Sequence, residues 1–107
     1  MLPQNLDLYK YLADIIQLPM VQDVIEMHGG TINSNKILWP LTTVYRYKVY
    51  YTIDTQSRCV YFQGVSGKNE NKLMNNEKEI LFVLNHLLAT IRLSMLIANT
   101  PDLEDPV

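Results

Sequence analysis

The sequence has few of the residues that build catalytic or metal-binding sites. Cys59 is the single cysteine, which excludes an internal disulfide, and nothing therefore indicates an oxidising compartment. The two histidines, His28 and His86, lie in different predicted elements, and their spacing from Cys59 is typical of neither a metal site nor a Cys–His nucleophile pair. The glycine-containing stretch 63–69 has the spacing of neither a P-loop nor a nucleophile elbow. We therefore expect no cofactor, no metal and a function other than catalysis.

A basic surplus and a secretion signal are also missing. The net charge is −2 and the pI is about 5.5, which argues against a protein whose main task is to bind phosphates. Residues 1–10 have neither the basic nor the apolar region of a signal peptide. The apolar run 80–98 contains Asn85, His86 and Arg92, and an arginine near mid-membrane costs about 2.5–3.5 kcal/mol. We expect a cytoplasmic protein that does not enter a membrane.

The length favours one domain. A chain of 107 residues, 48% of them apolar, predicts a single globular core. We place this domain at residues 1–99. Residues 100–107 are acidic and flanked by prolines, and we expect them to form a disordered tail.

The first third of the chain shows helical periodicity. Apolar residues recur on one side of the segment 5–17, where Asn5 is a candidate N-cap. Pro19 suits the first turn of a second helix, over residues 19–28, which the Gly29-Gly30 pair would end. We therefore predict two short N-terminal helices.

The period then changes to two. Residues 36–39 predict a short strand that Pro40 ends, at an edge of the sheet. Residues 43–53 are rich in aromatic and β-branched side chains and predict the main strand, and residues 59–65 predict its antiparallel partner after a turn at 54–58. The Asn-rich segment that follows predicts an exposed loop.

A long helix closes the chain. Asn76 with Glu79 three residues later forms a capping-box pattern, and Pro101 follows the last helical residues, so the helix should run over 76–98. The sequence thus predicts an α+β fold, with two short N-terminal helices, a two- or three-stranded antiparallel sheet and a long C-terminal helix packed on it. One broad apolar face of this helix should cover the sheet: Ile80, Val83, Leu84, Leu87, Leu88, Ile91, Met95 and Ala98.

The same helix carries a second apolar stripe on nearly the opposite side. Its residues follow the +4, +3 spacing of a coiled-coil seam: Phe82, His86, Ala89, Leu93 and Leu96. Either the N-terminal helix pair covers this stripe, or a second subunit does, which would make a homodimer. His86 would then either titrate at the interface or form a hydrogen bond at the edge of the core.

The main strand predicts a surface of a different kind. Strict alternation directs Tyr45, Tyr47, Val49, Tyr51 and Ile53 to the core. The other side would then present a basic and aromatic row of Arg46, Lys48, Tyr50, Tyr61 and Gln63. The aromatic side chains of this row would stack on the bases of a nucleic acid while its cations neutralise the phosphates. Alternatively, the row would contact a protein, or simply form the solvated face of the sheet.

The stretch YRYKVYYTIDTQSRCVYFQGVSGK, residues 45–68, resembles the central hairpin of RelE/HigB-type toxins. These are ribosome-dependent endoribonucleases of small α+β fold with helices before the sheet. The resemblance covers 24 of 107 residues and consists of the strand pattern with Tyr45-Arg46 and Ile53-Asp54. The chain departs from that family in its acidic charge and hydrophobic last helix, so the resemblance implies a degenerate toxin-like ribonuclease. The matching basic positions are Arg46, Lys48 and Lys68.

Taken together, the sequence favours a small non-enzymatic interaction or regulatory protein that acts through protein–protein contacts with a partner or with itself. The alternative is a nucleic-acid-binding protein, or the degenerate ribonuclease, using the basic and aromatic sheet face.

Overall fold

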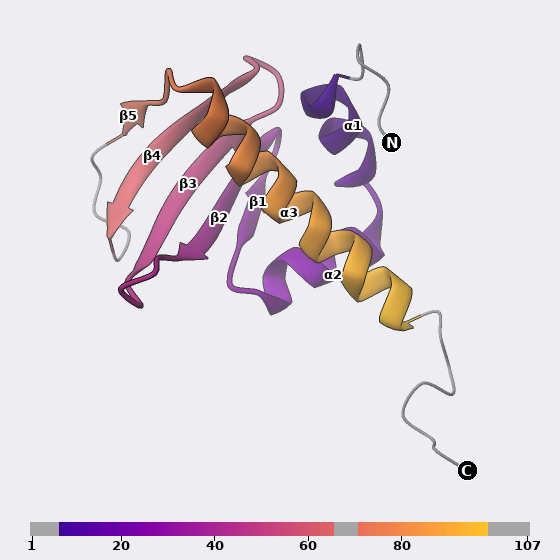
Figure 1. Cartoon of the computed structure of the whole chain (residues 1–107). Coiled ribbons are helices and arrows are strands. Elements are labelled where there is room, and N and C mark those ends of the chain that lie inside the picture. The colour runs from indigo at the N-terminus through magenta and orange to yellow at the C-terminus, as the bar shows by residue number, and fades with distance from the viewer. Residues whose placement is uncertain (1–6, 66–70, 99–107) are drawn as a thin grey trace.

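The computed structural model describes residues 7–65 and 71–98. It has an α+β fold in which an antiparallel sheet, in the order β1-β2-β3-β4-β5, follows two short helices and precedes a long one (Figure 1). The predicted tail at 100–107 lies outside the described residues. The elements are α1 (Leu8–Ile15), α2 (Pro19–Met27), β1 (Thr31–Asn33), β2 (Lys36–Thr42), β3 (Lys48–Asp54), β4 (Cys59–Val65), β5 (Lys72–Leu73) and α3 (Glu77–Ala98).

The fold class is as predicted, but the sheet has five strands instead of two or three. The two strands that the sequence did not reveal are β1, with three residues, and β5, with two. Segments this short contain too few residues for a period of two to be recognised. Both are the edge strands of the sheet, next to the longer β2 and β4.

Local hydrogen bonds explain where the helices begin. The carboxylate of Asp7 accepts the backbone N–H groups of Tyr9 and Lys10, so Asp7 is the N-cap of α1. The predicted cap, Asn5, lies outside the described residues. Pro19 occupies the first turn of α2, as predicted, and Asn76 caps α3 by accepting from the N–H groups of Lys78 and Glu79.

The connection between β2 and β3 differs from the prediction. The main strand begins at Lys48, because residues 43–47 form a turn in which the Thr43 N–H donates to the Tyr47 carbonyl at 2.8 Å. Tyr45 and Tyr47 are 79% and 61% exposed, so their assignment to the core was wrong. The alternating pattern simply continues through the turn, and a period alone cannot show where a strand stops. Of that predicted row, Val49 and Ile53 are buried and Tyr51 is half-buried.

Strand β2 continues through Pro40 to Thr42, beyond the predicted end. Its pairing with β1 stops at Leu38, whereas its pairing with β3 runs along its whole length. Pro40 therefore lies where β2 is paired on one side, which a residue without an N–H tolerates. The prediction that this strand lies at an edge of the sheet was wrong, because β1 pairs with the first half of β2 and is itself the edge strand.

Helix α3 runs diagonally across one face of the sheet, from beside β5 to α2 (Figure 1). The face predicted to cover the sheet does so: Val83, Leu84, Leu87, Leu88 and Ile91 are buried, Ile80 and Met95 are half-buried, and Ala98 at the helix end is exposed. Beneath the helix, Ile37, Trp39, Ile53 and Val60 from three strands are almost completely buried.

The chain makes a close approach between α2 and the sheet at Gly30. A Cβ atom built there would lie 2.7 Å from the Leu38 carbonyl oxygen and 2.9 Å from Cγ2 of Ile25. The neighbouring Gly29 has φ +89°, a left-handed conformation typical of a helix C-terminus. The predicted helix stop is therefore confirmed, and Gly30 also lets α2 rest on β2.

Candidate interaction surface on helix α3

The second stripe of α3 lies on the side of the helix away from the sheet. We call it the outer stripe: Phe82, His86, Ala89, Leu93 and Leu96. Phe82, Leu93 and Leu96 are 63%, 59% and 64% exposed, and the other two residues are exposed as well. The N-terminal helix pair therefore does not cover the stripe, which was one of the two arrangements that the sequence left open.

A shallow hollow of about 420 Å³ lies in the outer stripe, at its smallest side chain. It is lined by Ala89, Arg92, Leu93 and Leu96. Phe82 and Leu96 lie seven residues before and after Ala89, so a large apolar side chain stands two helical turns away on either side of Ala89.

His86 joins the outer stripe to the core. Trp39, the one tryptophan of the chain, is only 1% exposed, and its Nε1–H donates to Nδ1 of His86 at 3.0 Å. Although His86 as a residue is exposed, its Nδ1 atom thus faces a buried indole. The ring of Phe82 lies 6.3 Å from that of His86 between centroids, which continues the contact along the stripe. The hydrogen bond at the edge of the core, one of the two roles predicted for His86, is present.

Both histidines lie near Trp39. The ring of His28, at the C-cap of α2, is 6.2 Å from the indole, and the ring of His86 is 5.9 Å from it. Nδ1 of His28 is 2.9 Å from the Val24 carbonyl oxygen, to which it donates. Burial, with a smaller contribution from the charge of His28, lowers the pKa of His86 below its ordinary value. His86 is therefore held in its neutral form, with Nδ1 as the acceptor.

The predicted row on the sheet is only partly assembled. Tyr50, Tyr61 and Gln63 are half-buried on the face opposite α3, with Lys48 exposed at the start of β3. Arg46 lies in the β2–β3 turn, with φ +69°, so its placement on the strand was wrong. The row thus keeps one of its two cations.

The open face of the sheet is instead largely neutral and polar. Nε2 of Gln63 donates to Oγ1 of Thr52 at 2.8 Å and to Oδ1 of Asn71 at 2.6 Å. Lys36 pairs in register with Asp54, whose pKa is lowered mainly by the Ser57 N–H and in smaller part by Lys36. Around these groups is an open hollow of about 530 Å³ lined by Thr31, Asn33, Lys36, Leu38, Thr52, Asp54, Tyr61, Gln63 and Asn71.

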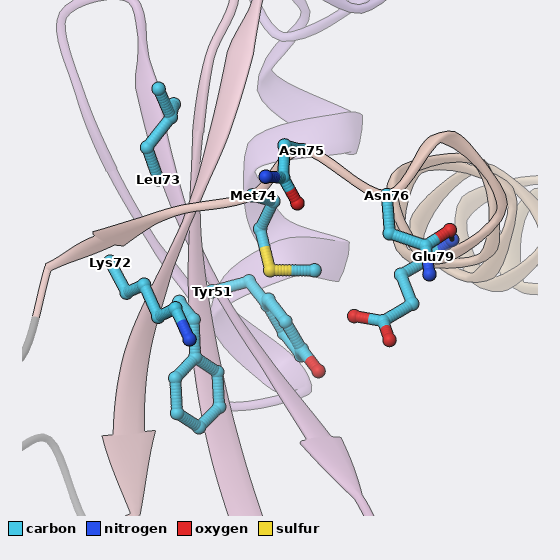
Figure 2. Close-up of a pocket in the computed structure, with 8 residues that line it drawn as sticks. Tyr51, Lys72, Leu73, Met74, Asn75, Asn76 and Glu79 are labelled. Atoms are coloured by element: carbon cyan, nitrogen blue, oxygen red, sulfur yellow. Dashed lines mark hydrogen bonds between the residues drawn. The ribbon is translucent and has the colours of Figure 1, made fainter.

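Another pocket, of about 380 Å³, opens between β5 and the start of α3 (Figure 2). The rings of Tyr51 and Phe62 meet edge-to-face in it, with 5.5 Å between their centroids. The Glu79 carboxylate points toward the Tyr51 hydroxyl (Figure 2). Burial and the charge of Glu79 raise the pKa of Tyr51, so its hydroxyl stays protonated and cannot serve as a base near neutrality. The sequence does not indicate this pocket, because the Asn-rich composition around Lys72 and Met74 predicts a loop.

The described residues give no support to metal or nucleophilic chemistry. Within 7–65 and 71–98, no group of three or more histidine, cysteine, aspartate or glutamate side chains is placed to hold a metal ion. Cys59 is half-buried at the start of β4, whereas both histidines lie against Trp39. The three residues therefore do not form one site.

Helix α3 is also long and apolar enough to cross a membrane, by length and composition alone. It has 22 residues and a most apolar window with mean hydropathy 1.9, and 28% of that window is buried inside the protein. The buried part is the face that packs on the sheet, and the remainder includes the outer stripe.

No protein-family model, curated protein or solved structure matches this chain.

Proposed function

We propose that this protein is a small non-enzymatic interaction or regulatory protein that self-associates through the outer stripe of α3. One observation carries the proposal: three large apolar side chains, each about 60% exposed, follow heptad spacing on one face of a single helix. Burying each such side chain contributes about 1.5–3 kcal/mol. Residues at this spacing bury one another when a second helix lies alongside.

A two-fold, antiparallel pairing of two α3 helices fits the stripe best. With Ala89 at the crossing, Phe82 of one copy meets Leu96 of the other, and the short Ala89 side chains let the helices approach closely. The hollow at Ala89 then receives an apolar side chain from the second copy. Antiparallel helices also place the positive end of one macrodipole beside the negative end of the other.

A protein partner accounts for α3 better than a membrane does. The buried face of the helix holds the core together, and insertion into a bilayer would remove Val83, Leu87 and Ile91 from the sheet. Arg92 lies in the middle of the C-terminal half, where the bilayer interior disfavours it. As part of the same proposal, we place the protein in the cytoplasm.

Light scattering after size-exclusion chromatography tests the self-association. At high micromolar concentration the chain should elute with the mass of a dimer. Leu93→Glu should weaken the dimer at least about a hundredfold, because it introduces a charge into the buried stripe. Leu81→Glu is the matched control, since Leu81 is 48% exposed on the same helix but outside the stripe.

The two variants also separate interface from core. Leu93→Glu should keep the helical circular dichroism and cooperative unfolding of the parent chain. A parent chain that is monomeric at high micromolar concentration contradicts the proposal. Equal loss of the dimer in Leu81→Glu and Leu93→Glu also contradicts the proposal, because the effect would then not be specific to the stripe.

A further inference from the structure

The hydrogen bond between Trp39 and His86 links the core to a residue of the proposed interface. The protonation state of His86 can therefore affect that interface. We infer that protonation of His86 dissociates the α3 dimer, so that self-association is lost at acidic pH. This inference rests on the proposed function and names how the same surface is regulated.

The first step is the fate of the hydrogen bond. Nδ1 of His86 accepts the Nε1–H of Trp39 through its lone pair, and neutral His86 carries its proton on Nε2. A proton added at Nδ1 uses that lone pair and places two N–H donors opposite each other. The imidazolium ring must then turn away from the indole, and the Trp39 N–H loses its acceptor inside the core.

The second step is the charge around His86. From α2, the facing titratable group is His28, whose positive charge lowers the pKa of His86 further. From β2, the facing group is Trp39, which does not titrate. On α3, the positions one turn away carry no charge: Phe82, Val83, Ala89 and Thr90. Nothing in this set stabilises an imidazolium ion.

The third step is the second copy. In the antiparallel register centred on Ala89, Arg92 of the second copy lies opposite His86, with Leu93 next to it. A guanidinium group and an apolar side chain both disfavour a charged histidine more than water does. Protonating His86 therefore costs more free energy in the dimer than in the monomer. Protonation consequently shifts the monomer–dimer equilibrium toward the monomer. Because each dimer contains two such sites, the penalty of protonation is counted twice in the dimerisation equilibrium.

The single tryptophan allows both events to be followed in the full-length chain. Trp39 fluorescence reports protonation of the neighbouring imidazole, and sedimentation velocity at pH 7.5 and 5.5 reports the dimer. We expect the fluorescence to change with a midpoint below 6.5, and the dimer to weaken at least about tenfold over the same range.

Two variants assign the effect to His86. His86→Asn places an amide oxygen near the position of Nδ1 and cannot titrate, so both pH responses should disappear; His86→Gln serves if the asparagine variant does not fold. His28→Asn keeps a donor for the Val24 carbonyl and should retain both responses.

The outcomes are distinguishable. A dimer of equal strength at pH 7.5 and 5.5 overturns this inference and leaves the proposed function intact. Acid dissociation that persists unchanged in the non-titrating variant also overturns it, because another group would then be responsible. A monomer at pH 7.5 overturns the proposed function itself, and the regulation with it.

Discussion

The Nε1–H of Trp39, in the buried layer of the sheet, donates to Nδ1 of His86 on the exposed side of α3, across 3.0 Å. One hydrogen bond therefore ties the centre of the core to the surface that we propose as an interface. It also makes the core sensitive to the protonation state of a residue near that surface.

The stability of the chain itself should depend on this histidine. Burial lowers the pKa of His86 in the folded protein, so the unfolded chain binds more protons near pH 6. The unfolding free energy should therefore be fully retained above about pH 6.5 and decrease as the pH falls through the lower folded-state pKa. Urea denaturation of the monomeric Leu93→Glu variant from pH 7.5 to 5 measures this. If the unfolding free energy of His86→Asn depends on pH as strongly as that of the parent, another group is responsible.

Gly30 should not tolerate a side chain. The Leu38 carbonyl oxygen, 2.7 Å from a built Cβ, is backbone and cannot move without shifting β2. Gly30→Ala should destabilise the chain by about 1–3 kcal/mol in thermal or urea unfolding. Gly29→Ala is the comparison, because its Cβ has room and costs mainly the left-handed φ, about 1 kcal/mol. Equal or smaller loss at Gly30 would contradict the close approach.

Asp7 has two roles that can be separated. It caps α1 and forms a salt bridge with Arg58 in the turn after β3, where Arg58 is 60% exposed. Asp7→Ala should cost about 1 kcal/mol through loss of the cap, whereas Asp7→Asn keeps a capping oxygen and should cost only a few tenths, because exposed ion pairs contribute little. A double-mutant cycle with Arg58→Ala checks this. A coupling energy well above 1 kcal/mol would show that the ion pair matters more than the cap.

How far the sequence foretold the structure depends on the length of each pattern. Helix α3 extends over six turns with a capping residue at its start, and both of its apolar faces were placed correctly. The turn at Tyr45 was missed because tyrosine, arginine and valine continue the strand composition into it. β1 and β5 are too short to carry a pattern.

The contact that matters most for the site could not be predicted. Trp39 and His86 are 47 residues apart, and nothing local in either segment indicates that α3 crosses the sheet above β2. That crossing is set by the packing of the whole core. The hollow at Ala89, in contrast, follows from a small residue within a stripe of large ones, which the sequence does show.

The nucleic-acid alternative also has a direct test. With Arg46 in the turn, the open sheet face holds neutral polar groups, Lys36 in register with Asp54, and Lys48 at the start of β3. We therefore expect no binding of labelled single-stranded RNA at low salt. Binding that Arg46→Glu with Lys48→Glu abolishes would restore the nucleic-acid role and count against the interaction protein proposed here.

Disulfide trapping in a Cys59→Ser background tests the antiparallel pairing of two α3 helices. If two α3 helices cross in antiparallel fashion at Ala89, the Ala89→Cys chain should form a covalent dimer rapidly under mild oxidation. The Phe82→Cys chain should not, since Phe82 would face Leu96 of the second copy. We expect this contrast at low micromolar concentration of the chain. Trapping at neither position would contradict the interface, and equal trapping at both would contradict the antiparallel register.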